Sequence, residues 1–333
     1  MKNYKLLVVG CGLIGSKRLT ASIKAGVPVE NLFVYDPNFD LLKFQSNNNF
    51  KNITIVESTN SLTNYNITHA IVAVPHNKAV SIVSDLLTQG IIVLMEKPLA
   101  RNLLESEQLF NHPKSKNLSV GFNYRFMPGI QILRKAILSK DLGDISSLKF
   151  ELGHGGSPGD EESWKLDPIK AGGGVILDPG IHLIDLLVFL FEGANENIEI
   201  IGVTKWKGFW NTGIEESVSI IGYVKKIPFN ITCSIVAWRT RFHVEVIGTE
   251  GYIEVNGRGR TDGPHSYIKG IRWGWKNGDS QRNSEVNKVL STEDLSLEIE
   301  TAAWIKGERG ICNISSAYDG MKIYNQIKEQ ELR

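Results

Sequence analysis

Two groups of residues have types and spacings that could carry out chemistry. Glu96-Lys97-Pro98 follows an apolar run, and a partly buried lysine there could donate or accept a proton at a reacting centre. Asp178, His182 and Asp185 stand at positions i, i+4 and i+7, so on one helix they would share a face. Two carboxylates and a histidine on one face could bind a metal or perform acid–base chemistry.

Each of these residues also has an interpretation without catalysis. Lys97 could be a solvated turn residue paired with Glu96. Asp178 could be a helix N-cap, His182 a hydrogen-bonded core histidine, and Asp185 a structural hydrogen-bond acceptor. The residue types alone therefore leave both catalytic and structural roles open.

A third group forms a glycine-rich loop, Gly10-Cys11-Gly12-Leu13-Ile14-Gly15. Its G-x-G-x-x-G spacing lies between a predicted strand and a predicted helix, where glycines allow a tight turn and a close approach of pyrophosphate to the helix N-terminus. The next predicted strand ends at Asp36, which could accept hydrogen bonds from ribose hydroxyls. An ordinary glycine-rich turn is the alternative. Because Asp36 would repel a 2′-phosphate and no Arg or Lys follows before Lys43, NAD is favoured over NADP.

The surrounding helices and strands must position these three groups of residues. In the first 124 residues, patterns typical of strands alternate with patterns typical of helices. Helices are predicted at residues 13–25 and 78–89, and buried strands at residues 5–9, 31–35, 53–56, 69–74, 91–95 and 118–122. This alternation predicts βαβ units and a parallel sheet covered on both faces, in a first domain of residues 1–124.

Residues 125–333 have a different pattern and predict a second α/β domain. Helices are expected at residues 128–139, 175–191, 295–306 and 318–328, and strands at residues 145–152, 198–207, 217–224, 229–238, 242–247 and 252–255. Tight turns between several strands indicate an antiparallel sheet. Residues 256–291 give no clear pattern.

Composition excludes several classes of protein. With 37 basic and 36 acidic side chains, the net charge of +1 argues against a nucleic-acid or polybasic membrane protein. No apolar stretch is long enough to span a membrane, and the apolar run after Lys5 is too short for the lipoprotein signal that Cys11 superficially suggests. The three scattered cysteines, Cys11, Cys233 and Cys312, are typical of a reducing cytoplasm.

Further motifs occur in a fixed order along the chain. They are Ala73-Val74-Pro75, Glu96-Lys97-Pro98-Leu99, Val120-Gly121-Phe122-Asn123-Tyr124-Arg125, Trp164-Lys165-Leu166-Asp167, Gly172-Gly173-Gly174 with Asp178 to Asp185, and Gly248-Thr249-Glu250-Gly251. With the glycine loop, they make the chain resemble the glucose–fructose oxidoreductase, inositol dehydrogenase and MocA family of NAD(P)-dependent oxidoreductases over nearly its whole length. The resemblance implies an N-terminal Rossmann domain and a C-terminal α/β domain whose open, mostly antiparallel sheet often forms an oligomer interface.

The resemblance also implies site residues. Lys97, Asp178 and His182 would form the catalytic group, without a metal. The expected cofactor-binding residues are Gly10, Gly12, Leu13, Ile14, Gly15, Asp36, Val74, Pro75, His76, Glu96, Lys97 and Arg125. The expected substrate-binding residues are Lys97, Asn123, Arg125, Trp164, Asp178, His182 and Arg239. Trp164 and Arg239, with the further lining candidates Arg241 and His243, are chosen for their chemistry, because aromatic faces and cationic groups suit sugars and phosphate-bearing groups. One departure concerns the loop after Pro75, where the family commonly has a histidine four positions on and this chain has Ala79, with His76 directly after Pro75.

The predicted activity is hydride transfer between a nicotinamide and a carbinol carbon of a small-molecule sugar, polyol or nucleotide-linked sugar. One alternative is an oxidoreductase for a cyclic non-sugar substrate, such as a dihydrodiol or a tetrapyrrole. Another is a non-catalytic NAD-binding regulator, although such a protein would be expected to lack Lys97 or His182. The alternating Ile, Val, Phe and Trp of residues 198–255 predict an apolar sheet face too large for a monomer, and hence a homodimer or homotetramer.

Overall fold

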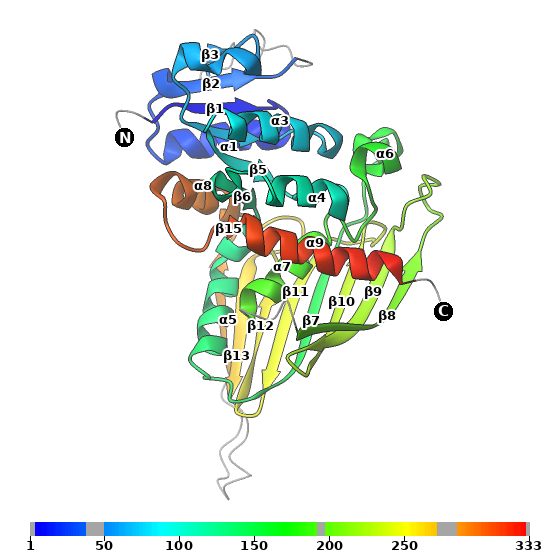
Figure 1. Ribbon diagram of the computed structural model, residues 1–333. Helices are drawn as coiled ribbons and strands as arrows, with labels where there is room; N and C mark the ends of the chain where they lie inside the picture. The colour runs from blue at the N-terminus through cyan, green and yellow to red at the C-terminus, as the bar shows by residue number, and fades with distance from the viewer. Residues whose placement is uncertain (1–3, 38–49, 192–196, 272–284, 331–333) are drawn as a thin grey trace, which may run out of the picture. The chain divides into compact units, whose positions relative to one another are not determined.

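The computed structural model describes residues 4–37, 50–191, 197–271 and 285–330 (Figure 1). The chain forms two compact units. The first contains Met1–Asn123, Ile169–Gly172 and Ser296–Met321, and the second contains Tyr124–Pro168, Gly173–Leu295 and Lys322–Arg333. Two stretches that the sequence analysis placed in the second domain, residues 169–172 and 296–321, therefore pack with the first unit.

The first unit contains a doubly wound parallel sheet. Its strands are β1 (Leu6–Val9), β2 (Leu32–Tyr35), β3 (Thr54–Ile55), β4 (His69–Val72), β5 (Ile92–Glu96), β6 (Leu118–Gly121) and β15 (Cys312–Asn313). They lie in the order β15-β6-β5-β4-β1-β2-β3, and only β15 is antiparallel to its neighbour. Every residue of β1 is buried, as expected for a central strand covered on both faces. The order 3-2-1-4-5-6 confirms the predicted Rossmann arrangement.

Helices cover this sheet. They are α1 (Leu13–Lys24), α3 (His76–Thr88), α4 (Leu103–Phe110) and α8 (Ser296–Lys306), with short 3₁₀ helices η1 (Val29–Asn31), η2 (Thr59–Tyr65) and η3 (Ser115–Asn117). Helix α1 packs against α8, and α3 packs against β5 and α4. Helix α4 was not predicted; the Asn102 side chain caps it by accepting from the backbone N–H of Glu105 at 2.9 Å.

The second unit is built on a mostly antiparallel sheet. Its strands are β7 (Ile145–Gly153), β8 (Ile198–Trp206), β9 (Ser217–Val224), β10 (Ile227–Ser234), β11 (Arg241–Gly248), β12 (Gly251–Asn256), β13 (His265–Ile271) and β14 (Glu285–Ser291). They lie in the order β14-β13-β12-β11-β7-β10-β9-β8, and only the pair β7 and β10 is parallel. Strands β13 and β14 fall in the stretch that the sequence left unassigned.

Two helices lie on one face of this sheet. Helix α5 (Pro128–Leu138) packs on β12 and β13, and α7 (Ile181–Leu190) packs on β7; Figure 1 shows both on the same side. The remaining elements are η4 (Asn123–Phe126), η5 (Asp160–Glu162), η6 (Trp164–Leu166), α6 (Pro168–Ala171) and α9 (Ile314–Glu329). Among the residues described, no helix is both long and apolar enough to cross a membrane.

The open face of the sheet is less apolar than expected. Strand side chains alternate between faces, and the buried residues Phe229, Ile231 and Cys233 of β10 and Phe242, Val244 and Val246 of β11 lie on the covered face. Their alternate neighbours, Asn230, Thr232, His243 and Glu245, lie on the other face. At these central strands, polar side chains therefore interrupt the apolar face that the alternating pattern of residues 198–255 predicted. Exposed apolar side chains occur on the outer strands, at Ile201, Ile221, Tyr223, Val286 and Val289.

Three predicted element boundaries are also wrong by four residues or more, one of them the start of α9, which is Ile314 and not residue 318. Helix α7 begins at Ile181, and residues 175–180 form turns. Pro179 has no backbone N–H, and Gly180 packs so closely that a Cβ there would lie 2.6 Å from the carbonyl oxygen of Val175. Strand β10 ends at Ser234, four residues earlier than predicted.

Candidate active site

The loop between β1 and α1 has the shape that a dinucleotide requires. Gly10 has a φ of +92°, and a Cβ there would lie 2.4 Å from the carbonyl oxygen of Ala73. A Cβ on Gly15 would lie 1.8 Å from the carbonyl oxygen of Gly10, so helix packing excludes a side chain. A Cβ on Gly12 would meet no atom within 4 Å. Gly10 and Gly15 are therefore needed by the fold, whereas Gly12 leaves open space at the amino end of α1.

This helix end also has the polarity that suits a phosphate. No side chain caps α1, and its first turn contains no acidic residue. No side chain of α1 itself therefore neutralises the partial positive charge of its first backbone amides. Leu13 beside it is 74% exposed, an apolar surface that a bound dinucleotide would cover. A dinucleotide fits the loop in space and in charge.

Asp36 lies directly against the glycine loop. It follows β2, which pairs with β1 in parallel, and its Oδ2 accepts the backbone N–H of Cys11 at 2.8 Å. Burial and the nearby Asp36 charge raise the pKa of the Cys11 thiol to about 12, so this cysteine stays protonated. The hydrogen bond fixes the carboxylate at the edge of the loop. Lys43, the first cation after Asp36, lies outside the described residues.

Several expected cofactor and catalytic residues gather at one edge of the parallel sheet. The glycine loop, Asp36, Val74-Pro75 and Lys97 follow the carboxyl ends of β1, β2, β4 and β5, which are neighbours in the sheet. Open α/β sheets bind their ligands at this edge. Lys97 is partly exposed, directly after β5. The structure thus brings these predicted residues together within the first unit.

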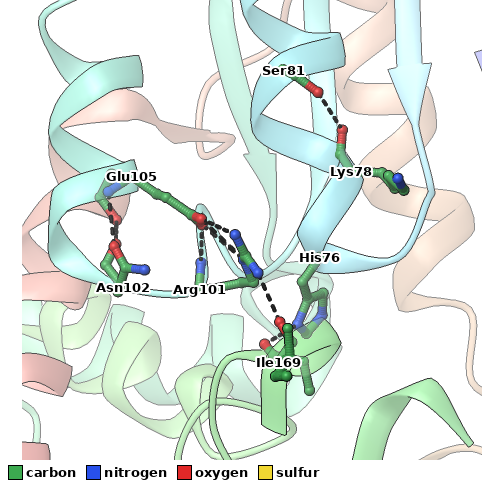
Figure 2. Close-up of polar contacts among 9 residues, drawn as sticks. His76, Lys78, Ser81, Arg101, Asn102, Glu105 and Ile169 are labelled. Atoms are coloured by element: carbon green, nitrogen blue, oxygen red, sulfur yellow. Dashed lines mark hydrogen bonds and ion pairs between the residues drawn. The ribbon is translucent and has the colours of Figure 1, made fainter. Parts of the chain in front are cut away.

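His76 and Glu96, two expected cofactor contacts, have partners inside the first unit. His76 is buried, and its Nδ1 donates to the carbonyl oxygen of Ala171 at 2.9 Å (Figure 2). Oε1 of Glu96 accepts from Nε of Arg18 at 2.7 Å. Their contact with a cofactor therefore stays a prediction.

Arg18 is a buried charged residue beside the candidate site that the sequence did not single out. It is fully buried, and its guanidinium also contacts Glu300 Oε2 at 2.7 Å and Thr301 Oγ1 at 2.9 Å. Burial alone would lower its pKa, but the two carboxylates raise it above the usual range. Arg18 thereby ties α1 to the strand end that carries Lys97. The sequence signal was an arginine on the buried face of α1, beside Leu19 and Ser22.

In the second unit, His182 lies in α7 and is 5% exposed. Its ring stacks on that of Tyr124, with ring centroids 4.0 Å apart and an angle of 12° between the planes. Tyr124 packs edge-on against Phe242, and its hydroxyl accepts a hydrogen bond from Arg258. Arg258 in turn donates to Asp262 at 2.7 Å. Tyr124 and Arg258 were not predicted as site residues, since neither spacing nor periodicity links them to His182.

Asp178 lies in the turns before α7, so it does not share a helix face with His182 and Asp185 as expected. Its Oδ2 lies 3.5 Å from Nζ of Lys165. His154, after β7, is close enough to interact electrostatically with Asp178; burial lowers its pKa, and the carboxylate opposes that effect. Asp178 therefore has a polar, charged surrounding in the second unit.

Asp185 and Arg125 form a buried ion pair. Nε of Arg125 donates to Oδ2 of Asp185 at 2.8 Å, and a second nitrogen contacts Oδ1. Arg125 is 5% exposed and also lies over the ring of Phe189. Asp185 thus serves as the structural acceptor that was one of its two interpretations. A contact of Arg125 with cofactor or substrate stays a prediction.

The other expected substrate residues are scattered. Asn123 donates to Ser296 Oγ at 2.6 Å in the first unit, and Trp164 is partly exposed at the start of η6. Arg239 is exposed in the loop after β10, next to Trp238, which is 96% exposed. Two further lining candidates bond within the sheet: Arg241 to Glu151, and His243 to Asn256. Within the described ranges, no group of three or more His, Cys, Asp or Glu side chains could hold a metal ion.

Sequence comparison relates the chain to known proteins. Residues 4–124 match the family model described as "Oxidoreductase family, NAD-binding Rossmann fold", and residues 130–254 match the "GFO/IDH/MocA C-terminal domain". Glucose-6-phosphate 3-dehydrogenase of Bacillus subtilis is 28% identical over 62% of this chain and 66% of its own length. Trans-1,2-dihydrobenzene-1,2-diol dehydrogenase of Bos taurus is 29% identical over 54% of this chain and 52% of its own length. The chain thus spans less than two thirds of each relative.

Solved structures share the fold over almost the whole chain. Levoglucosan dehydrogenase in complex with NADH and levoglucosan superposes with a TM-score of 0.80 at 18% identity, covering 98% of both chains. A 3-ketoreductase from Actinomadura kijaniata in complex with NADP gives a TM-score of 0.75 at 17% identity, covering 98% of this chain and 97% of the other. From its glycine loop, sheet orders and two adjoining domain matches, the chain belongs to the GFO/IDH/MocA family of oxidoreductases.

Proposed function

We propose that the protein is an NAD-dependent oxidoreductase that transfers a hydride between nicotinamide and the carbinol or carbonyl carbon of a sugar, polyol or nucleotide-linked sugar. The observation that carries this proposal is the open space in front of Gly12 at an uncapped helix end, with Asp36 fixed beside it. Relatives named as dehydrogenases of a sugar phosphate and of a diol support the class of substrate.

The preference for NAD over NADP rests on Asp36. The backbone N–H of Cys11 fixes the Asp36 carboxylate against the glycine loop. In this position the carboxylate would accept a hydrogen bond from a ribose hydroxyl and would repel a 2′-phosphate. Family members use both cofactors, since one solved neighbour is a complex with NADH and another with NADP. We expect NADH to bind at least about tenfold more tightly than NADPH, as measured by fluorescence titration. Equal affinities would contradict the role of Asp36.

In the proposed mechanism the chain supplies proton transfer and electrostatic stabilisation, and the nicotinamide, when bound, supplies the hydride chemistry. His182 takes the hydroxyl proton when the substrate is oxidised and returns it to the oxygen when the substrate is reduced. Lys97 hydrogen-bonds the same oxygen and stabilises its developing negative charge. Asp178 orients the substrate or the lysine.

The stacking of Tyr124 on His182 supports the proton-transfer role, because it fixes the plane of a ring that must meet the substrate hydroxyl at a defined angle. The ion pair of Arg18 with Glu96 supports the role of Lys97, because it fixes the strand end from which Lys97 projects. Both supports are buried and made of charged or aromatic groups, so they hold these positions rigidly.

The direct test is a panel of sugars, polyols and nucleotide-linked sugars, followed by the NADH absorbance with NAD and with NADP. The proposal predicts turnover with at least one carbohydrate and NAD. Turnover only with cyclic diols would instead favour the second candidate, which the relative named as a dihydrodiol dehydrogenase supports. NADH binding without turnover on either class would indicate a non-catalytic regulator.

We further propose that the protein works in the cytoplasm as a homodimer or homotetramer. Its three cysteines are buried and form no disulfide, as in proteins of a reducing compartment. The exposed Ile201, Ile221 and Tyr223 on β8 and β9 offer apolar area for a second copy. Light scattering coupled to size-exclusion chromatography measures the mass directly, and a mass equal to one chain would contradict the oligomer.

A further inference from the structure

A short segment between β7 and α7 belongs to a different unit from the chain on either side of it. Residues Ile169–Gly172 pack with the first unit, whereas Pro168 before them and Gly173 after them belong to the second. Most of the segment forms the single turn of α6. Ile169 is 76% exposed and Lys170 is also exposed, whereas Ala171 is buried.

Two side chains of the first unit hold the backbone of this segment. Nη1 of Arg101 donates to the carbonyl oxygen of Ile169 at 2.7 Å, and Nδ1 of His76 donates to that of Ala171 at 2.9 Å. Figure 2 shows both side chains reaching the segment, His76 from the start of α3 and Arg101 from the loop before α4. The bond from the guanidinium is charge-assisted and therefore the stronger type.

Arg101 is itself held in one orientation. Its Nε and Nη2 contact the carboxylate of Glu105, with Nε at 3.0 Å from Oε1, and its backbone N–H donates to Oε2 at 3.1 Å. Glu105 is in turn fixed at the start of α4 by the cap from Asn102. The guanidinium therefore presents Nη1 to Ile169 without having to be ordered first.

The close approach of the segment to Arg101 also explains why position 172 is a glycine. Gly172 has a φ of +86°, and a Cβ there would lie 2.3 Å from Cβ and 2.9 Å from Cα of Arg101. A side chain at position 172 would push the segment away from Arg101. A Cβ on Gly173 would instead meet Tyr324, and one on Gly174 would meet Glu215, both within the second unit. Each glycine thus serves a different close contact.

We propose that Arg101 is a positioning residue for catalysis. With His76, it holds the Ile169–Gly172 segment on the first unit and so fixes the point from which the chain enters the turns that carry Asp178, six residues after Gly172. Arg101 itself follows Lys97 by only four residues, so one stretch of chain carries both a proposed catalytic residue and this anchor. The catalytic part of the inference rests on the proposed function.

Limited proteolysis tests the anchor without any need for turnover. Lys170 lies between the two anchored carbonyls and is an exposed trypsin site. In Arg101→Ala, cleavage after Lys170 should accelerate by on the order of tenfold, because local opening becomes easier. Arg101→Lys should give an intermediate rate. Ser81→Ala, which removes an exposed bond to the carbonyl of Lys78 in the same region, should cleave like the wild type.

Kinetics test the catalytic consequence. In Arg101→Ala, kcat should fall by on the order of tenfold while the Kd for NADH changes by less than about twofold, since neither the glycine loop nor Asp36 is altered. Should Arg101→Ala not fold, Glu105→Gln, which loosens the guanidinium, should show both effects to a smaller degree. An unchanged cleavage rate at Lys170 would overturn the anchor, and faster cleavage with an unchanged kcat would overturn its catalytic role. Absence of turnover in the wild type would instead count against the proposed function.

Discussion

At the scale of single residues, candidate site residues within each unit have their orientation set by a second buried group. Asp36 is fixed by the N–H of Cys11, Glu96 by Arg18, and the ring of His182 by Tyr124. Each of these supports restricts a group to one geometry before any ligand arrives. Preorganisation of this kind lowers the cost of reaching a reactive arrangement.

The stacking of Tyr124 on His182 gives a prediction at this scale. Tyr124→Leu removes the aromatic contact, whose stacking is worth about 0.5–1.5 kcal/mol, and lets the imidazole leave its orientation. We expect kcat to fall by on the order of tenfold, measured with the substrate that the panel identifies. Tyr124→Phe keeps the stack and loses only the hydroxyl bond to Arg258, so it should retain most of the activity. Equal kcat in the wild type and Tyr124→Leu would argue against His182 as the proton-transfer group.

At the scale of elements, the loop between β1 and α1 contains glycines that are needed for two different reasons. Gly12 leaves space for a ligand, and Gly15 allows α1 to pack closely. Gly12→Ala places a methyl group in open space and an ordinary backbone conformation, so the Tm should change little. The same methyl would occupy the space left for the pyrophosphate, and the Kd for NADH should rise at least about tenfold. Fluorescence titration and thermal unfolding measure the two effects.

Gly15→Ala is the matched variant. Its methyl would lie 1.8 Å from the carbonyl oxygen of Gly10, so α1 would have to move away from β1. Overpacking of this kind typically costs about 1–3 kcal/mol, and the Tm should fall clearly. If Gly12→Ala instead lowered the Tm and left NADH binding intact, the open space would not be a phosphate site.

The elements also show what the sequence could predict. The strands of the Rossmann sheet were predictable because their apolar runs are continuous, and the glycine loop because its spacing follows from backbone geometry. The start of α7 was missed because the apolar pattern continues back through Val175, Ile176 and Leu177, which are buried in turns. Hydrophobicity reports burial, and it does not separate a helix from a buried turn.

The partners of buried charges were not predictable either. Glu300 is 282 positions from Arg18 in the chain, and no local pattern reports a pairing at that distance. The same holds for Arg258, which reaches Tyr124 across 134 positions. A single sequence shows which charges lie on buried faces, while the choice of partner depends on the tertiary fold.

At the scale of the whole molecule, two histidines, the partly buried His69 and the buried His265, predict sensitivity to acid. Burial lowers the pKa of His69 to about 4 and also lowers that of His265. His265 caps α5 in its neutral form, because its Nε2 accepts the N–H of Gly129 at 2.8 Å while its Nδ1 donates to the carbonyl oxygen of Gly257. A proton on Nε2 of His265 would prevent this nitrogen from accepting the hydrogen bond from Gly129.

Since the ordinary histidine pKa is 6.5, the unfolded chain binds more protons than the folded one below that pH. The contribution of these neutral histidines to the free energy of unfolding is therefore fully present above pH 6.5 and is lost as the pH falls toward about 4. Urea unfolding at several pH values should show a free energy of unfolding that decreases over this window. His265→Gln, which can donate and accept without titrating, should show a weaker dependence. A flat profile for the wild type would contradict the neutral assignment.

The central claim of the proposed function is that Lys97 and His182 both act on the substrate. The most direct measurement compares Lys97→Ala with the wild type for NAD-dependent turnover and for NADH binding, using Lys78→Ala on the exposed side of α3 as the control. We predict a loss of kcat of at least about a hundredfold in Lys97→Ala, a Kd for NADH within about twofold of the wild type, and wild-type behaviour in the control. Undiminished turnover in Lys97→Ala would contradict the account.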